Sequence, residues 1–180
     1  MSRTRSVSGV VLAAGAGTRY GMPKVLAGQG EWLRYAVAAL VDGGCDDVVV
    51  VLGAAVVEVP SPARAVVAED WRTGMSASIR AGLAAADGAD VVLLHLVDTP
   101  DVGADVVARV RDAVGASSSG LARATFGGRP GHPVAIARKH WAALALTLRG
   151  DDGARAFLSG RDDVIAVECG DLATGVDIDE

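Results

Sequence analysis

A short segment near the N-terminus combines three glycines with two cations, directly after an apolar run. The segment spans residues 12–24, reads LAAGAGTRYGMPK, and contains Gly15, Gly17, Gly21, Arg19 and Lys24. Glycine lets backbone N–H groups approach an anion closely, and two cationic side chains supply the charge that a triphosphate needs as pyrophosphate leaves. These residue types predict a phosphate-binding loop. The alternative is a tight turn with charged residues on its surface.

Other glycine-rich loops fit this segment less well. The dinucleotide fingerprint requires GxGxxG, whereas the spacing here is GxGxxxG and the next helix is expected only after Lys24. The acidic residue that would bind a ribose is missing at the end of the second expected strand, where Leu52, Gly53 and Ala54 stand. The ATPase phosphate loop requires Ser or Thr after Gly-Lys, which this segment lacks. The spacing therefore favours a nucleoside triphosphate over a dinucleotide.

Acidic residues follow one apolar run and recur near the C-terminus. Asp98 comes directly after residues 90–97 (DVVLLHLV), and Pro100 forces a turn, so the carboxylate should face the ligand edge of a sheet. Mg²⁺ prefers oxygen ligands and usually takes one or two protein carboxylates together with substrate phosphates. Asp177 and Asp179 offer the second carboxylate. We expect only one of them to bind, because alternate residues of an extended segment point in opposite directions; the alternative is that they are merely solvated.

Apolar runs alternate with segments of helical periodicity along the chain. The apolar runs predict strands at residues 6–14, 47–52, 64–68, 90–97, 121–126, 133–137 and 163–168. Helices are expected from Glu31 to the glycine pair 43–44, from Met75 with Thr73 or Ser76 as cap, over 101–114, from Trp141, and in a last short helix capped by Asp151. This alternation predicts an α/β fold: a three-layer α/β/α sandwich with a mostly parallel, Rossmann-like sheet, in a single domain of residues 1–180.

Composition and charge exclude several partners. The formal net charge is -5, and Lys and Arg do not gather into the basic stripe that a nucleic acid requires. No apolar stretch reaches the roughly twenty residues that span a membrane, and the run from Val7 is too short for a signal peptide. Cys45 and Cys169 are far apart and lack metal-ligand companions, which indicates a reducing compartment. We therefore expect a cytoplasmic protein that binds neither nucleic acid nor membrane.

The glycine-rich segment and five later motifs resemble those of one family. LAAGAGTRYGMPK is similar to the LAAGxxxRMGxxK signature of the MobA-like nucleotidyltransferases, the group related to molybdenum cofactor cytidylyltransferase. The further motifs follow in the family's order: WRTGMSAS at 71–78, LVDTP at 96–100, GGRPGHP at 127–133, GDDGAR at 150–155 and VDID at 176–179. The six motifs are spread from residue 12 to residue 179, so the resemblance extends over nearly the whole chain. The resemblance implies the nucleotidyltransferase type of α/β fold.

The resemblance also implies a role for each motif. Nucleotide binding is implied for Leu12, Ala13, Ala14, Gly15, Gly17, Lys24, Gly74, Met75, Ser76 and Ser78. Binding of the acceptor is implied for Arg129, Gly131 and His132, which we expect in a glycine-rich segment between two short strands. Catalytic roles are implied for Arg19, Lys24 and Asp98, and the family pattern favours Asp179 over Asp177 as the second metal ligand. His95 lies inside an expected buried strand and is predicted to be a core residue or one that supports the site from behind.

The implied reaction transfers a nucleoside monophosphate with Mg²⁺ as cofactor. A phosphate of the acceptor, implied to be molybdopterin, attacks the α-phosphorus of the triphosphate, and pyrophosphate leaves without a covalent enzyme intermediate. CTP is favoured because guanylyl-transferring relatives tend to read LAGG where residues 12–15 read LAAG, and the methyl group of Ala14 narrows the base pocket. A molybdoenzyme or its chaperone is a possible further partner.

Two residues depart from the family pattern, and other functions fit the sequence. Tyr20 replaces the usual Met and Thr99 the usual Gln, which bears on the contacts to the nucleotide. One alternative is a guanylyl- or other nucleotidyltransferase of the same fold with a different phosphorylated acceptor. Alternatives of another class are an NAD(P)H-dependent oxidoreductase and a non-catalytic chaperone that binds the cofactor.

Overall fold

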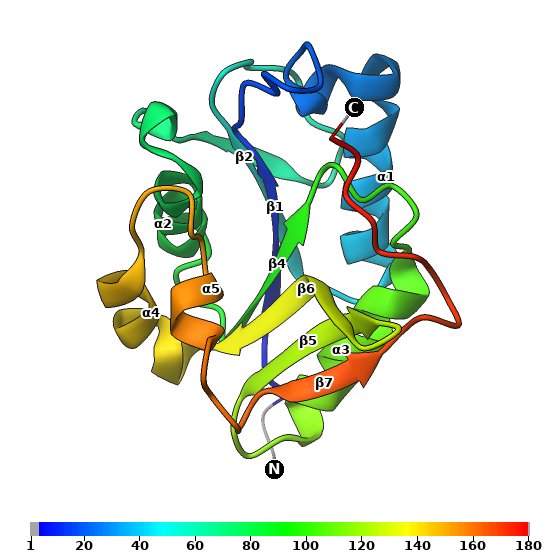
Figure 1. Cartoon of the computed structure of the whole chain (residues 1–180), viewed down its shortest axis with the longest axis vertical. Coiled ribbons are helices and arrows are strands. Elements are labelled where there is room, and N and C mark those ends of the chain that lie inside the picture. The colour runs from blue at the N-terminus through cyan, green and yellow to red at the C-terminus, as the bar shows by residue number, and fades with distance from the viewer. Residues whose placement is uncertain (1–3, 180) are drawn as a thin grey trace.

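A seven-stranded sheet forms the centre of the computed structural model, with helices on both of its faces (Figure 1). The structure describes residues 4–179, so residues 1–3 and 180 of the predicted domain lie outside the described part. The strands are β1 (Val7–Ala13), β2 (Asp47–Leu52), β3 (Arg64–Val67), β4 (Val91–Leu96), β5 (Leu121–Phe126), β6 (Arg129–Ala137) and β7 (Ile165–Glu168). The helices are α1 (Glu31–Asp42), α2 (Met75–Ala85), α3 (Ala104–Ala116), α4 (Trp141–Thr147) and α5 (Arg155–Leu158), with short 3-10 segments at Lys24–Gly30, Trp71–Thr73 and Arg138–His140.

The sheet has a parallel half and a mixed half. Its strand order is β3-β2-β1-β4-β6-β5-β7. In the first half, β1 runs parallel to both β2 and β4, and β3 pairs in parallel with β2. In the second half, β6 runs antiparallel to β4 and β5, while β7 pairs in parallel with β5. The predicted α/β fold with a mostly parallel sheet is confirmed. The carboxyl ends of β1 and β4 are neighbours, which is where such sheets bind ligands.

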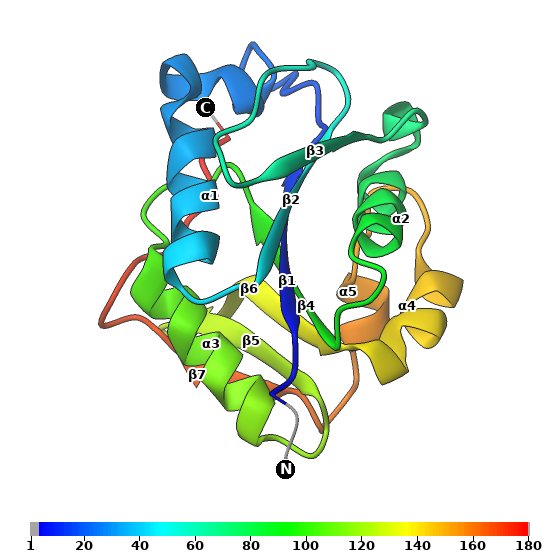
Figure 2. The same ribbon diagram turned by 180° about the vertical axis from the view of Figure 1, so that it is seen from behind.

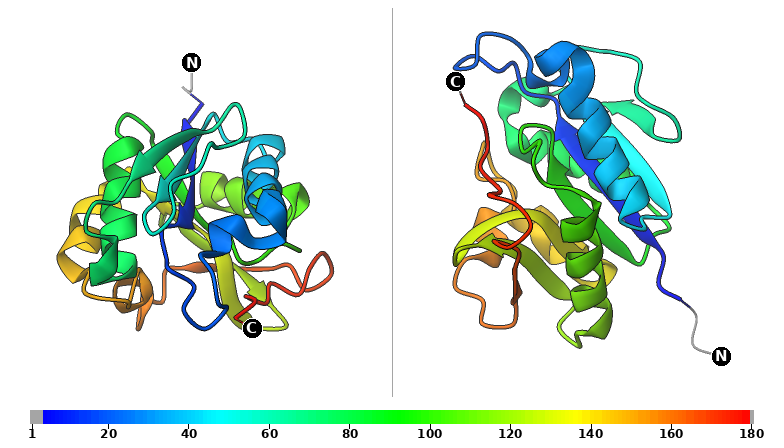
Figure 3. Two further views of the ribbon diagram at one scale, coloured as in Figure 1. Left: turned by 90° about the horizontal axis from the view of Figure 1, so that it is seen from above. Right: turned by 90° about the vertical axis from the view of Figure 1, so that its right-hand side faces the viewer.

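Two helical layers cover the sheet (Figures 2 and 3). The core on one face joins Val11 of β1 to Leu40 of α1 and to residues of α3. The core on the other face joins Val10 of β1 to Ile79 of α2 and to residues of α4 and α5. Successive strand residues point to opposite faces, so a strand covered on both sides must be apolar throughout, as the sequence of β1 is. In the part of the chain that the structure describes, no helix is both long and apolar enough to cross a membrane.

Two of the differences from the predicted elements involve residues near the ligand edge, namely the start of β6 and the cap of α2. β6 begins at Arg129 rather than at residue 133, because Gly127 and Gly128 adopt positive φ angles of 60° and 78° and close a hairpin that pairs Phe126 with Arg129. Double glycine is a common two-residue hairpin turn. The segment expected as a loop between two short strands is therefore part of a strand.

The start of α2 is the second difference. Neither Thr73 nor Ser76 caps the helix; the N-cap position is Gly74, with φ 113°, an angle that favours glycine. The carboxylate of Asp151 accepts a hydrogen bond from the Met75 N–H at 3.3 Å. Asp151 thus satisfies a free N–H of α2 and is not the N-cap of α5, a position occupied by Ala154. The two segments are joined by this bond.

His95 of β4 is buried among the core residues, as its place in an apolar strand predicts. Its side chain is fully inaccessible, and neither ring nitrogen has a hydrogen-bond partner within the described residues. Burial lowers the pKa of His95 from 6.5 to about 4, because the charged imidazolium is poorly solvated there. His95 is therefore neutral in the folded protein at pH 5 and protonated in the unfolded chain.

This burial predicts a pH-dependent stability. The unfolded chain binds the extra proton between pH 6.5 and about 4, so the stability contributed by His95 is present above pH 6.5 and is lost as the pH falls. We expect the free energy of unfolding to fall between pH 7 and pH 5 by about 2 kcal/mol more in the wild type than in His95→Leu. Urea unfolding at the two pH values measures this. An equal fall in both proteins would contradict a neutral buried imidazole.

Candidate nucleotide and metal site

A cleft lies at the carboxyl ends of β1 and β4, bounded by the loop after β1, the start of α2 and the segment before the C-terminus. Its volume is about 540 Å³, within the range that suits a small ligand. It is lined by Leu12, Ala13, Ala14, Gly15, Ala16, Gly17, Thr18, Arg19, Tyr20, Lys24, Val25, Trp71, Arg72, Gly74, Met75, Ser78, Leu96, Val97, Asp98, Asp151, Asp177 and Asp179. The structure therefore brings the predicted phosphate loop and all three predicted metal ligands to one place.

The glycine-rich loop contains a turn that is held by a backbone hydrogen bond. The Gly21 N–H donates to the Gly17 carbonyl at 2.8 Å. Gly17 has φ 62°, and a Cβ there would lie 1.8 Å from the Met22 carbonyl oxygen, so no other residue fits. Arg19 and Lys24 line the cleft together with the glycines Gly15 and Gly17 of the loop. Such a loop can hold an anionic group with backbone donors and two cations.

Lys24 is placed between two carboxylates from distant parts of the chain. Its Nζ lies 2.7 Å from Asp98 Oδ2 and 2.9 Å from Asp179 Oδ1. Burial lowers the pKa of Lys24, but its hydrogen bonds to the two carboxylates outweigh burial, and the pKa is raised overall. The ammonium group is therefore charged at neutral pH and acts as the counter-ion of the acidic cluster.

The two carboxylates that share Lys24 have opposite pKa shifts. Burial raises the pKa of Asp98, although the bond to Lys24 offsets part of that effect. The bond to Lys24 lowers the pKa of Asp179, whose side chain is 42% exposed against 15% for Asp98. The difference in burial explains the opposite signs, since desolvation disfavours the charged form. Of these two carboxylates, Asp98 is therefore the one whose charged form depends more on a neighbouring cation.

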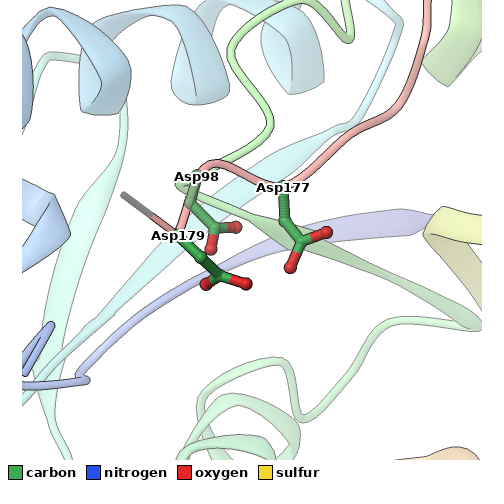
Figure 4. A group of neighbouring side chains, drawn as sticks. All are labelled: Asp98, Asp177 and Asp179. Carbon is green, nitrogen blue, oxygen red and sulfur yellow. The ribbon is translucent and has the colours of Figure 1, made fainter. Parts of the chain in front are cut away.

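Asp98, Asp177 and Asp179 form a compact acidic cluster (Figure 4). Each offers one carboxylate oxygen, and these oxygens all lie within 4.8 Å of one another. The Ile178 N–H donates to the Asp98 carbonyl at 3.0 Å, which fixes the C-terminal segment against the turn after β4. Both Asp177 and Asp179 approach Asp98, because the segment is irregular and strand alternation does not apply to it; that only one of them binds the metal stays a prediction. Three carboxylate oxygens this close together suit a divalent cation. Lys24 supplies the positive charge beside two of these carboxylates, Asp98 and Asp179.

The start of α2 supplies the opposite wall of the cleft. Gly74, Met75 and Ser78 line it, as the prediction of nucleotide contacts requires. Ser76 does not belong to the cleft lining: it is 5% exposed, its N–H donates to the Gly150 carbonyl at 3.0 Å, and its hydroxyl has no partner among the described residues. The Met75, Ser76 and Ala77 N–H groups already have acceptors in Asp151, Gly150 and Gly74, so this wall offers a nucleotide its side chains and the positive end of the helix dipole.

The residues predicted to bind the acceptor lie beside the cleft and not in it. Arg129 is exposed next to the hairpin turn, and none of Arg129, Gly131 and His132 is among the described residues that line the cleft. Burial lowers the pKa of His132 to about 3, with smaller contributions from the charges of His95 and Arg123. The imidazole of His132 is therefore neutral at physiological pH, and it sits at the same end of the β4–β6 pair as the cleft residue Leu96.

Sequence reasoning missed several residues of the cleft. Trp71 and Arg72 line it, and the Arg72 guanidinium lies 4.5 Å from the centre of the Trp71 ring. Both residues begin the WRTGMSAS motif, so the motif could have indicated that they line the cleft. Asp151 also lines the cleft. Its position could not be foreseen, because it depends on the packing of the segment before α5 against α2.

Comparison with known proteins gives a family and a relative of similar length. The model of the family described as MobA-like NTP transferase domain matches residues 9–164. Among curated proteins, nicotine blue oxidoreductase from Paenarthrobacter nicotinovorans is 38% identical over 96% of this chain and 92% of its own length.

Solved structures with the same fold include proteins of similar size. Rv0371c from Mycobacterium tuberculosis H37Rv is 27% identical with a TM-score of 0.80, covering 97% of this chain and 93% of that one. A complex of Rv0371c with manganese gives a TM-score of 0.73 at the same identity, covering 97% and 94%. A nucleotidyl transferase from Methanothermobacter is 20% identical with a TM-score of 0.78, covering 97% and 92%, and shows the fold alone.

Proposed function

Because the chain belongs to the MobA-like NTP transferase family, we propose that it transfers CMP from CTP to the phosphate of molybdopterin and releases pyrophosphate. The observation that carries the transferase proposal is the position of Lys24, between Asp98 and Asp179 in the cleft that the glycine-rich loop also lines. Cations and carboxylates at such distances suit a triphosphate with its divalent metal. The two unpaired cysteines, Cys45 and Cys169, support the expected cytoplasmic location.

Different residues of the cleft have different roles in the proposed reaction. The glycine-rich loop would bind the triphosphate through backbone N–H groups, and Arg19 and Lys24 would hold the negative charge of the departing pyrophosphate. Asp98, Asp177 and Asp179 would hold Mg²⁺, which when bound neutralises charge on the phosphates. An acceptor phosphate oxygen forms the new bond to the α-phosphorus as the bond to the β-phosphate oxygen breaks. The protein aligns the two substrates and forms no covalent intermediate.

The choice of CTP depends on Ala14. This residue lines the cleft and is 4% exposed, and its carbonyl accepts a hydrogen bond from the Ala54 N–H at 2.9 Å. Its methyl group narrows the pocket relative to glycine, which disfavours the larger guanine base by a modest factor. The molybdopterin acceptor follows from the resemblance of residues 127–133 and 150–155 to the family motifs.

A second candidate function is that of an NAD(P)H-dependent oxidoreductase, an alternative that the sequence leaves open, and one relative is named nicotine blue oxidoreductase. The end of β2 argues against dinucleotide binding. Gly53 and Ala54 stand where a carboxylate would bind the ribose, and a Cβ at Gly53 would lie 2.7 Å from both the Ala14 carbonyl oxygen and the Trp71 side chain. Neither position carries an acidic residue, and position 53 has no room for a side chain. A triphosphate fits the loop better.

Thermal shift separates these candidates. A ligand that binds only the folded state at about 100 times its Kd adds about 2.7 kcal/mol of stability, or roughly 5–10 °C for a domain of this size. We expect a shift of this order with Mg²⁺ and CTP, a smaller one with Mg²⁺ and GTP or ATP, and none with NADPH.

The control is Mg²⁺ alone, and Lys24→Ala should lose most of the CTP shift. A rise in melting temperature with GTP and not with CTP would make GTP the proposed donor nucleotide. A shift with NADPH alone would reject the transferase in favour of the oxidoreductase.

A further inference from the structure

Arg123 of β5 is a partly buried cation whose hydrogen-bonding capacity is only partly used. Its Nη2 donates to the Gly131 carbonyl at 3.3 Å, where the register between β5 and β6 shifts. Its Nε is buried and has no hydrogen-bond partner among residues 4–179. A buried N–H donor without an acceptor is unfavourable, unless a ligand or a water molecule accepts its hydrogen bond. The unpaired Nε therefore indicates a missing acceptor.

Two further basic residues are associated with Arg123: His132 directly follows Gly131, whose carbonyl accepts the Arg123 hydrogen bond, and Arg155 of α5 interacts with Arg123 electrostatically. The charge of Arg123 contributes to lowering the pKa of His132, and the charge of Arg155 in α5 contributes to lowering the pKa of Arg123, although burial dominates both shifts. Within the described residues, neither Arg123 nor Arg155 forms an ion pair with a carboxylate. By contrast, aspartates pair with Arg64, Arg109, Arg111, Arg138 and Arg161. Neighbouring guanidinium groups without a counter-ion repel each other, which an anion would relieve.

This basic cluster, defined as Arg123, His132 and Arg155, adjoins the cleft. The register that pairs Leu94 with Val134 places His132 at the same end of the β4–β6 pair as Leu96, which lines the cleft. Arg155 follows Asp151, another cleft residue, by four positions and begins α5 on the face of the sheet that α2 also covers (Figure 1). An anion held by the cluster would lie beside the nucleotide and not in the glycine-rich loop.

We propose that Arg123, His132 and Arg155 bind a phosphate monoester, and that this group is the phosphate of the acceptor. The assignment of the acceptor rests on the proposed transferase function. Arg123 Nε and the exposed guanidinium of Arg155 supply charged donors, and the neutral imidazole of His132 supplies one more N–H. The cluster moves the expected acceptor site away from exposed Arg129 and adds two residues that the motif GGRPGHP does not contain.

The test is calorimetric titration of inorganic phosphate into the full chain, with the glycine-rich loop filled by Mg²⁺ and the non-transferable analogue α,β-methylene CTP. We expect one saturable phosphate site that remains under these conditions. Arg155→Gln and Arg123→Gln should each weaken it by about tenfold or more, the factor expected for a lost charge-assisted hydrogen bond. Arg34→Gln, which removes an exposed arginine of α1 on the opposite face of the sheet, should leave it unchanged.

Separate outcomes distinguish the two proposals. Absence of saturable phosphate binding beside a bound nucleotide analogue, or unchanged binding in Arg155→Gln, overturns the basic cluster alone. Phosphate binding that persists when no nucleotide shifts the melting temperature overturns the transferase and leaves the cluster as an anion site. Arg155 is exposed, so its variant decides the matter if Arg123→Gln lowers the melting temperature. Lys24→Ala should show the converse pattern, with weakened nucleotide binding and unchanged phosphate binding.

Discussion

Asp98→Asn should lower the rate of pyrophosphate release, at saturating CTP, Mg²⁺ and molybdopterin, by about a hundredfold or more. The substitution keeps the shape of the side chain but removes the negative charge that lies 2.7 Å from Lys24 Nζ and at the centre of the acidic cluster. Loss of one preorganised electrostatic contact in an active site typically costs about 10²–10³ in rate. The backbone carbonyl that accepts the Ile178 N–H is unaffected, so the C-terminal segment should stay in place. A coupled pyrophosphate assay measures the effect.

Asp162→Asn provides the matched control, because Asp162 is an exposed carboxylate outside the cleft lining among the described residues. It should retain the full rate. A rate in Asp98→Asn within threefold of the wild type would show that Asp98 does not act in the reaction. A wild-type protein that binds CTP and molybdopterin but releases no pyrophosphate would be a non-catalytic chaperone.

Lys24→Met should have two opposite effects, and together they identify the role of this lysine. We expect the rate of pyrophosphate release to fall about a hundredfold, since the cation that would accompany the leaving pyrophosphate is lost. We also expect the affinity of the nucleotide-free protein for Mn²⁺ to rise severalfold. The ammonium group lies 2.7 and 2.9 Å from two carboxylates of the acidic cluster, so a metal that binds there must compete with it.

Isothermal titration with Mn²⁺ measures the second effect, and the pyrophosphate assay measures the first. Lys139→Met removes an exposed lysine whose Nζ donates to the Ser118 carbonyl, far from the cleft in the fold, and should change neither quantity. A fall in Mn²⁺ affinity in Lys24→Met would mean that the lysine supports the metal site instead of competing for it.

Local sequence was sufficient to predict the fold and the centre of the site. The continuous apolar runs of β1 and β4 identify strands covered on both faces, and ligands of such sheets bind beyond the carboxyl ends. The pattern of strands and loops therefore predicts that Gly17 and Lys24 lie near Asp98, although 74 residues separate Lys24 from Asp98. The parallel pairing of β1 with β4 brings them together.

The rest depended on contacts that no local pattern encodes. The approach of both Asp177 and Asp179 to Asp98 follows from an irregular segment held by the Ile178 N–H, where strand alternation does not apply. The bond from Met75 to Asp151 joins segments 76 positions apart. The neighbourhood of Arg123 and Arg155 depends on how α5 lies over the sheet. Residue type indicated the chemistry in each case, but not the partner.

The junction between β4 and β6 bears on how the acceptor specificity of proteins with this sheet can change. On one side of it, the parallel strands carry the glycine-rich loop and Asp98, to which the segment after β7 returns Asp177 and Asp179; on the other side, the antiparallel hairpin and α5 carry the basic cluster. In the proposed reaction, the nucleotide donor and the acceptor would therefore contact different sets of residues, which meet at this junction. Substitutions in the β5–β6 hairpin and at Arg155 would then change the acceptor without altering the glycine-rich loop, Lys24 or the acidic cluster, so proteins with this sheet can share a nucleotide donor and differ in the acceptor that they modify.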